Sequence, residues 1–325
     1  MIRFGIIGTG KISRTFLQAA SKAPGFKLEA VYSRSEETGR AFAADYGVDK
    51  VYTSLEELGS DGDVDAVYIA SPNSSHCSQA VTMAGYKKHI LCEKPVASSL
   101  EELEIMIGAA RLNNRVLLEA MRPVFDPGFS KIRELLPELG PVRRAVFQYC
   151  QYSSRYDAFK KGIIENAFNP ALSNAALMDI GVYCIHPMAV LFGRPQGVTA
   201  SGIFLENHME GAGTVLMDYG HMLGEARYSK ITDSSEPSEI QGENASMLIW
   251  HIQDTKKIEL RYRGGGSRVF EIAKEDNNMY YEVLRFMELA ESEQGPELAM
   301  EHLMGSVVEM EIMDRVREIT GICFD

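Results

Sequence analysis

The stretch RFGIIGTGKIS, residues 3–13, reads as a buried strand that turns tightly into a helix. The run Arg3–Ile7 is apolar after its first residue, as in a strand that is covered on both faces. Gly8 and Gly10 then permit a sharp turn, because glycine reaches backbone conformations that other residues avoid. Ser13 is a small residue, as is needed where a helix packs closely on the preceding strand. This change from strand to helix predicts the fold of the segment that follows.

Short apolar or β-branched runs alternate with helical patterns as far as residue 120. The expected strands are RFGIIG (3–8), KLEAVY (27–32), KVYT (50–53), DAVYIA (65–70), HILCE (89–93) and RVLLEA (115–120). The helical patterns between them span Lys11–Lys22, Ser35–Tyr46, Leu55–Leu58, Ser75–Gly85 and Leu100–Leu112. Parallel strands need such crossovers, which cover both faces of the sheet. The sequence therefore predicts an α/β domain with a doubly wound parallel sheet over residues 1–121.

The alternation ends at residues 122–128, RPVFDPG, a proline-glycine stretch that reads as a connection between two domains. The signals that follow are a helix over Phe129–Leu136, a strand near Arg143–Tyr149, a helix around Ala175–Phe192, strands from Gly197 to Ile272, and helices over Asn277–Ala290 and Glu297–Ile319. Strands in succession without intervening helices favour an antiparallel arrangement. We expect residues 122–325 to form an α+β domain with a large, open, mostly antiparallel sheet.

Composition and charge exclude several classes of partner. The chain of 325 residues carries a formal net charge of −12, so a nucleic-acid or anionic-membrane partner is not expected. No apolar segment approaches the roughly 18–20 residues of a membrane span, and no signal-peptide core precedes the glycine turn. The five scattered cysteines form no CxxC pair, and the seven histidines form no HxxxH pair. We expect a cytoplasmic protein with reduced thiols and no metal site.

The glycine turn also matches a dinucleotide fingerprint, in the form G-x-G-x-x-S. In such a site the second glycine lets the backbone approach a pyrophosphate at the start of the helix. The candidate cofactor-binding residues are Gly8, Thr9, Gly10, Lys11 and Ile12. A glycine turn without a ligand is the alternative, but its place in the first of six strand–helix steps favours the dinucleotide.

The residues after the second expected strand bear on the choice of dinucleotide. An NAD site places an acidic residue about 20 positions beyond the fingerprint. This chain has Ser33 and Arg34 there, a hydroxyl and a guanidinium that could bind a 2′-phosphate. We therefore expect NADP, with NAD still possible. In the alternative interpretation Arg34 is only a solvated residue at the start of a helix.

Three polar residues share a stripe on the expected helix of the second domain. Asp179, Tyr183 and His186 are spaced i, i+4 and i+7 among apolar neighbours. Polar groups in such surroundings need partners or a cleft. They could form a substrate site. Alternatively, Asp179 and Tyr183 form a buried hydrogen-bonded pair, and His186 has its own hydrogen-bond partners within the protein.

Taken together, these motifs resemble the Gfo/Idh/MocA oxidoreductases, the family of glucose-fructose oxidoreductase and inositol dehydrogenase, and in particular its dihydrodiol and sugar dehydrogenases. The resemblance covers nearly the whole chain. It rests on GTGKIS (8–13), YSR (32–34), VYIASPNSSH (67–76), EKP (93–95) and LMDIGVY (177–183). It implies an NAD(P)-dependent dehydrogenase or reductase. Some members are non-catalytic, so a dinucleotide-binding sensor or scaffold protein is the alternative.

The resemblance also implies roles for single residues. Ser71, Pro72, Asn73 and His76 would shape the loop beneath the cofactor, Glu93 and Lys94 would lie at the nicotinamide, and Arg122 would lie near its ring. The second domain would bind the substrate, and its sheet would form a homodimer or a higher homo-oligomer.

The mechanism that we expect is hydride transfer to or from a carbinol or carbonyl carbon, with proton transfer by Tyr183. Because tyrosine ordinarily has a pKa near 10, a nearby Lys94 ammonium would be needed to stabilise the phenolate and to polarise the substrate oxygen. Asp179 would orient the lysine or bind a substrate hydroxyl, and His186 would support or contact the substrate.

Two departures from the family pattern leave the substrate open. Many members have histidine where this chain has Tyr183, and many have three glycines where it has Ser173-Asn174-Ala175. Sugars, sugar lactones, inositols and cyclic diols all carry adjacent hydroxyls that Asp179, His186 and residues 151–168 could bind.

Overall fold

The computed structural model describes residues 1–324 and divides the chain into two compact units. The first unit contains Met1–Ala120 together with Glu275–Met304. The second contains Met121–Lys274 and the chain from Gly305 onward. The two units meet between Ala120 and Met121, one residue before the expected domain boundary after residue 121. Residues 275–304, which we expected within the second domain, group with the first unit.

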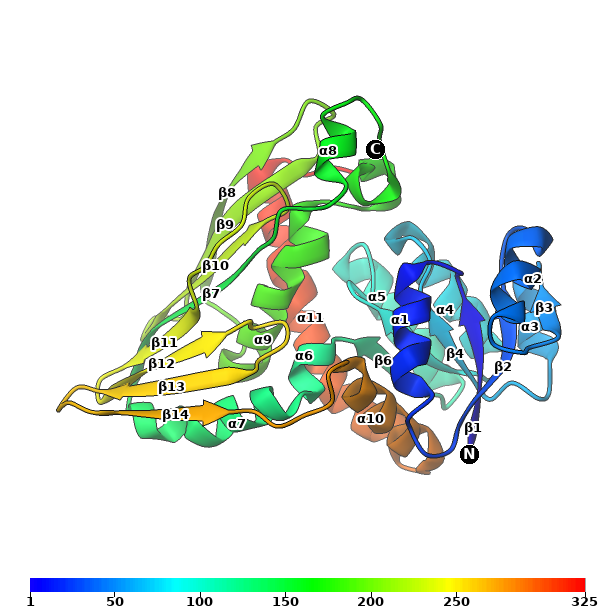
Figure 1. Ribbon diagram of the computed structural model, residues 1–325, viewed down its shortest axis with the longest axis horizontal. Helices are drawn as coiled ribbons and strands as arrows, with labels where there is room; N and C mark the ends of the chain where they lie inside the picture. Colours follow the sequence, from blue (N-terminus) through cyan, green and yellow to red (C-terminus); the bar gives the residue numbers. More distant parts are fainter. Residues whose placement is uncertain (325) are drawn as a thin grey trace. The chain divides into compact units, whose positions relative to one another are not determined.

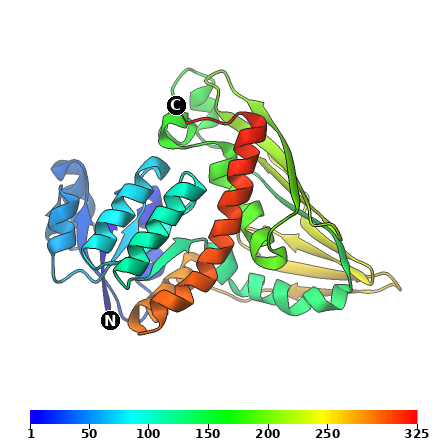
Figure 2. The same ribbon diagram turned by 180° about the vertical axis from the view of Figure 1, so that it is seen from behind.

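The first unit contains a parallel sheet of six strands (Figure 1). Its strands are β1 (Ile2–Ile7), β2 (Phe26–Tyr32), β3 (Lys50–Tyr52), β4 (Ala66–Ile69), β5 (His89–Glu93) and β6 (Leu117–Ala120), in the order β3-β2-β1-β4-β5-β6. The helices are α1 (Lys11–Ala20), α2 (Glu36–Ala44), α3 (Leu55–Ser60), α4 (His76–Gly85), α5 (Leu100–Leu112) and α10 (Met279–Glu291). This is the strand order of a Rossmann fold, and it confirms the predicted doubly wound sheet. Helices α4 and α5 lie side by side (Figure 2).

Aromatic packing joins α10 to the sheet, although α10 lies far along the chain. The ring of Phe4 in β1 lies 5.6 Å from Phe286 of α10 and 5.0 Å from Phe26 of β2, measured between centroids. Phe4 and Phe286 are fully buried, so each removes a large apolar area from water. Residues 275–304 are therefore part of the core of the first unit.

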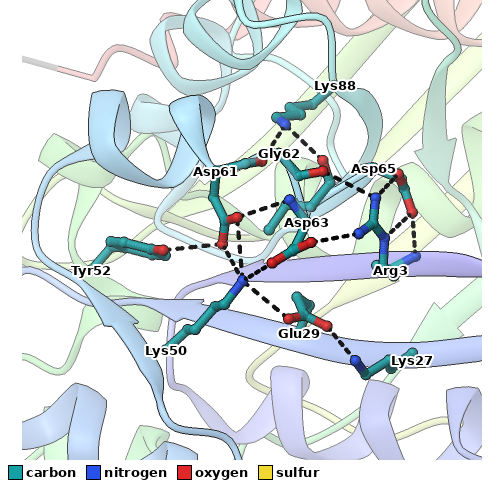
Figure 3. Close-up of polar contacts among 11 residues, drawn as sticks. Arg3, Lys27, Glu29, Lys50, Tyr52, Asp61, Gly62, Asp63, Asp65 and Lys88 are labelled. Carbon is teal, nitrogen blue, oxygen red and sulfur yellow. Dashed lines mark hydrogen bonds and ion pairs between the residues drawn. The ribbon is translucent and has the colours of Figure 1, made fainter.

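A network of ion pairs closes the sheet at the amino ends of its strands (Figure 3). Lys50 pairs with Asp61 at 3.0 Å and with Asp63 at 2.7 Å, while Arg3 pairs with Asp65 at 2.8 Å. The hydrogen bond from Arg3 is the main reason that the pKa of Asp65 is lowered. Each of these charged groups is paired with an opposite charge. The ion pairs therefore link β1 and β3 to the segment that precedes β4. The opposite edge carries the sequence motifs.

The second unit contains a sheet of eight strands that is mostly antiparallel, as predicted. In chain order they are β7 (Val142–Cys150), β8 (Gly197–Phe204), β9 (Glu210–Asp218), β10 (Leu223–Ser229), β11 (Ser238–Gly242), β12 (Ala245–Trp250), β13 (Lys257–Tyr262) and β14 (Ser267–Glu271). The order across the sheet is β14-β13-β12-β11-β7-β10-β9-β8. Within this eight-stranded sheet, as far as the structure describes it, β7 and β10 are the only neighbours that pair in parallel. The inward side chains of β12 alternate strictly with outward ones, as in a sheet that is covered on one face.

Residues 122–128, which were expected to connect the two domains, are mostly helical. They contain α6 (Arg122–Phe125) and the start of α7 (Pro127–Leu135). Pro127 occupies the first turn of α7, where a missing N–H costs nothing, and the Asp126 side chain accepts a hydrogen bond from the Gly128 N–H at 2.6 Å. The proline and glycine that suggested a linker therefore begin a helix.

The core of the second unit is built around a continuous apolar stretch, Pro170–Phe192. It contains the π-helical turn η5 (Leu177–Gly181) and α9 (Val182–Phe192), which packs on β7 and β10. By length and mean hydropathy (1.6) this stretch could cross a membrane, contrary to our expectation that no segment is long enough. However, 78% of its most apolar window is buried within the protein, as is typical of a core helix. The unit also contains α8 (Tyr156–Phe159) and the end of α11 (Gly295–Thr320).

Candidate active site

The glycine turn at the carboxyl end of β1 is held tightly against the loop after β4. Gly8 has φ of +108°, and a Cβ there would lie 2.6 Å from the carbonyl oxygen of Ala70. Only glycine fits this position without strain. Ser13 is fully buried, and its hydroxyl donates a hydrogen bond of 2.7 Å to the Gly8 carbonyl. The small third residue of the motif therefore also fixes the turn.

The start of α1 fits the phosphate groups of a dinucleotide. Gly10 is the N-cap of α1, and no side chain caps the N–H groups of the first turn. A Cβ on Gly10 would have no other heavy atom within 4 Å, and φ at Gly10 is −75°. The backbone conformation at Gly10 would therefore accept other residues, and the chain itself leaves room for a side chain there. An uncapped helix start next to open space is the arrangement that binds pyrophosphate.

The remaining residues of the motif, and those after β2, lie at the same edge of the sheet. Thr9 is half-buried, while Lys11 and Ile12 are exposed at the start of α1. After β2, the Ser33 hydroxyl is 2.8 Å from the hydroxyl of Thr38 in α2, so it takes part in the local structure of that helix. Arg34 is exposed and has no hydrogen bond or ion pair within residues 1–324.

His76 is a buried link between two loops at this edge. Its Nδ1 lies 3.0 Å from the Pro95 carbonyl oxygen, and its Nε2 lies 3.0 Å from the Ser71 carbonyl oxygen. The ring is fully buried, and burial lowers the pKa of His76. The loop that it holds contains half-buried Ser71, Pro72 and Asn73, the last in the short helix η1 (Asn73–Ser75). His76 therefore fixes this loop from beneath.

The loop after β5 is fixed by buried carboxylates. Glu93 is 7% exposed, accepts a hydrogen bond from the Tyr68 hydroxyl, and accepts another of 3.2 Å from the Lys94 N–H. Glu119 accepts one of 3.1 Å from the Val96 N–H. The Lys94–Pro95 peptide bond is cis, and Lys94 is half-buried. These hydrogen bonds hold the backbone of the loop on both sides of Lys94.

In the second unit, Asp179 lies in the π-helical turn η5. Such turns often occur at functional sites, because the extra residue redirects side chains. The turn begins at Leu177, whose N–H donates a hydrogen bond of 2.8 Å to Glu210. Burial raises the pKa of the Glu210 carboxyl to about 7, and the Leu177 N–H opposes that shift.

Asp179 forms an ion pair that the sequence analysis missed. Its Oδ2 lies 2.8 Å from Nζ of Lys230, which follows β10. The side chain of Lys230 is 1% exposed, whereas that of Asp179 is 37% exposed. Lys230 and Glu210 belong to no motif in the sequence, so no local signal could have identified them.

Tyr183 and His186 have different surroundings. The guanidinium carbon of Arg122 lies 5.4 Å from the centroid of the Tyr183 ring, and the Tyr149 ring meets it edge-on at 5.6 Å. His186 is 2% exposed, and its Nδ1 lies 2.5 Å from Glu309 of α11. The structure therefore brings Arg122 and Tyr183 together, while Asp179, Tyr183 and His186 each face a different partner.

Comparison with known proteins identifies the family. Residues 2–121 match the oxidoreductase family with an NAD-binding Rossmann fold, and residues 129–248 match the GFO/IDH/MocA C-terminal domain. The chain belongs to the Gfo/Idh/MocA family of oxidoreductases. It is an NAD(P)-dependent dehydrogenase or reductase that acts on CH–OH groups. The alternative of a non-catalytic sensor or scaffold protein is therefore not favoured.

Two curated relatives are similar over most or all of the chain. The scyllo-inositol 2-dehydrogenase (NADP(+)) IolU of Bacillus subtilis is 44% identical over 324 residues, which are 100% of this chain and 98% of that protein. The trans-1,2-dihydrobenzene-1,2-diol dehydrogenase of Danio rerio is 33% identical over 227 residues, covering 68% of this chain and 66% of that protein. Among solved structures, a 3-ketoreductase from Actinomadura kijaniata has a TM-score of 0.84 at 18% identity and covers 98% of both chains, which shows a shared fold.

Substitution of Gly10 tests whether the start of α1 binds the cofactor. Gly10→Val is expected to weaken NADPH binding about tenfold or more, because a loss of about 1.4 kcal/mol in contacts changes a dissociation constant tenfold. The free energy of unfolding should fall by about 0.5–2 kcal/mol, the usual range for loss of a favourable N-cap residue. Fluorescence titration and urea unfolding measure the two effects.

Gly8→Ala provides the matched comparison. It forces a Cβ against Ala70 in a left-handed backbone conformation, and is expected to destabilise the protein by about 1–3 kcal/mol. Wild-type NADPH affinity in Gly10→Val would show that the cofactor does not bind at the start of α1.

Proposed function

We propose that the protein is an NADP-dependent dehydrogenase of ring polyols, with an inositol or a closely related cyclic polyol as its substrate. The 44% identity to a scyllo-inositol 2-dehydrogenase over the full chain carries this proposal. The partly exposed carboxylate of Asp179 supports it, because an ionised carboxylate accepts hydrogen bonds from hydroxyl groups. Sugars, sugar lactones and cyclic diols present the same adjacent hydroxyls and are the next candidates.

The first unit would hold the cofactor. The start of α1 with Gly8, Thr9, Gly10, Lys11 and Ile12 would take the pyrophosphate, Arg34 with Ser33 would take the 2′-phosphate, and Ser71, Pro72, Asn73, Glu93 and Lys94 would shape the nicotinamide site. Arg122, which belongs to the second unit, would also contribute to cofactor binding. His76 would act from beneath by fixing the Ser71 and Pro95 carbonyls. When bound, the dinucleotide supplies the redox chemistry by accepting or giving up a hydride.

Three side chains would bind the substrate and move its proton, and a fourth would support them. Lys94 polarises the substrate oxygen, since an ammonium stabilises negative charge that develops there. Tyr183 transfers the proton of that oxygen. Asp179 accepts a hydrogen bond from a neighbouring substrate hydroxyl. His186, which is bonded to Glu309 and buried, supports α9 and acts on the substrate only through that helix.

A substrate screen tests this function. Scyllo-inositol and other inositols, aldoses and cyclic diols would be incubated with NADP⁺ while the nicotinamide absorbance is followed. We expect turnover with one or more ring polyols. Lys94→Met and Tyr183→Phe should lower kcat by about 100-fold or more, the range of general acid–base catalysis, with NADPH affinity largely retained.

The control variants for this screen are Lys22→Met and Tyr86→Phe, which lie on the surface. Lys22 pairs with Glu275 at 2.7 Å, and Tyr86 is 37% exposed, so turnover should stay near wild type. Near-normal turnover in Tyr183→Phe would remove Tyr183 from the mechanism. A wild-type protein that reduces or oxidises none of these compounds would contradict the proposed function.

Arg34 provides a test of cofactor preference. Loss of a charge-assisted contact costs about 1.5–3 kcal/mol, so Arg34→Ala should weaken NADP⁺ binding roughly 10- to 100-fold and leave NAD⁺ binding unchanged. Arg40→Ala is the control, because Arg40 is an exposed arginine on α2 that pairs with Glu36. Equal affinity of the wild-type protein for both cofactors would contradict a preference for NADP.

We also propose a cytoplasmic homodimer or higher homo-oligomer formed through the sheet of the second unit. Ile203 of β8 and Leu216 of β9 support this, because they lie on the same face and are 60% and 39% exposed. Sedimentation equilibrium should give a mass of at least twice the chain mass of 36.1 kDa. Leu216→Glu should lower the measured mass toward that of a single chain. Ile163→Glu places the same charge at an exposed apolar residue outside this sheet, and it should leave the measured mass unchanged. The mass of one chain at all concentrations would contradict the proposal.

A further inference from the structure

We infer that Lys230 is a positioning residue that fixes both the carboxylate of Asp179 and the loop 151–168, and thereby sets how tightly a polyol substrate is bound. This inference rests on the proposed function for its substrate class. Its structural basis lies wholly within the second unit, in the contacts of one buried ammonium group.

The Lys230 ammonium has three different partners. Nζ lies 2.8 Å from Oδ2 of Asp179, donates a hydrogen bond of 2.6 Å to the Ala167 carbonyl oxygen, and lies 4.8 Å from the centroid of the Phe168 ring. A buried charge is costly unless such partners compensate for lost water. Here a carboxylate, a carbonyl dipole and an aromatic face supply that compensation. The position of the ammonium is therefore closely defined.

The backbone of Lys230 binds the other end of the same loop. Its carbonyl oxygen accepts a hydrogen bond of 2.9 Å from the Ser153 N–H, and its own N–H donates one of 2.9 Å to the Gly211 carbonyl of β9. Ser153 lies near the start of the loop and Ala167 lies near its end. Lys230 thus joins both ends of the loop to the sheet.

The loop that Lys230 closes is lined by aromatic rings. Tyr156, Phe159 and Phe168 stack with centroid separations of 5.4–6.1 Å, and Phe168 is fully buried. Because Lys230 contacts Phe168, movement of the ammonium would disturb this stack and Asp179 together. The loop and the carboxylate are therefore coupled through one side chain.

The orientation of Asp179 depends on the same contact. Its side chain is 37% exposed, so one part reaches solvent while Oδ2 faces Lys230. Without the ammonium, the carboxylate would lose an ion pair that helps to fix its rotamer. A shift of about 1 Å in a group that positions a substrate can cost about 100-fold in rate. The role of Lys230 is exerted through Asp179 and the loop, with no contact to the substrate required.

A double-mutant cycle tests this inference. Lys230→Met keeps a long apolar side chain and removes the charge, and Asp179→Asn removes the carboxylate charge. Each single change is expected to lower kcat/KM for the polyol roughly tenfold or more, mainly through KM, with NADPH affinity unchanged. Because part of the effect of Lys230 passes through Asp179 and the rest through the loop, the loss in the double variant should be smaller than the product of the two single losses.

Lys256→Met is the matched control, since Lys256 pairs with Asp254 at 3.3 Å but is 57% exposed. It should retain wild-type kinetics. Losses that multiply in the double variant, or wild-type kcat/KM in Lys230→Met, would overturn the inference.

Amide hydrogen exchange separates this inference from the proposed function. Lys230→Met should speed exchange in residues 151–168 and 177–181 about tenfold or more relative to wild type, whereas Lys256→Met should not. If the wild-type protein turned over no polyol, the proposed function would fail, and exchange would still decide the role of Lys230. Unchanged exchange of residues 151–168 and 177–181 in Lys230→Met would overturn the inference about Lys230.

Discussion

Parallel hydrogen bonding among the six strands of the first unit is the constraint on which the cofactor site depends. In a parallel sheet every strand ends at the same edge, so motifs that are far apart in the chain meet there. The glycine turn after β1, Arg34 after β2 and Lys94 after β5 come together for this reason alone. The ion pairs of Arg3 and Lys50 hold the opposite edge, which leaves the motif edge free for chemistry.

The sequence predicted those parts that follow from local pattern. Each strand of the first unit could be identified because it is a short apolar run bounded by turn residues, and the order of elements then implied the parallel sheet. Gly8 was predictable for the same reason, since the backbone at that position requires glycine whatever surrounds it. The predicted family followed from motifs of this kind and is confirmed.

Contacts between distant residues could not be predicted in this way. Lys230 is an isolated lysine in the sequence, and only the pairing of β10 with β7 and β9 brings it to Asp179 and to the loop 151–168. The same limit applies to Glu210, whose carboxylate holds the start of η5 from a neighbouring strand. The helical spacing of Asp179, Tyr183 and His186 suggested one shared environment, but the packing of β7, β10 and α11 gives each a separate partner.

The π-helical turn makes the second unit sensitive to the length of the chain at one place. An α-helix advances by about 100° per residue, so a single deletion within Leu177–Gly181 that restored regular α-helix would rotate Asp179 by about that angle relative to Tyr183. The carboxylate would then leave Lys230 even though both residues of the ion pair were kept. Relatives that share these residues but differ by one position in this turn would therefore present a differently shaped substrate site, so alignment gaps here carry more meaning than substitutions.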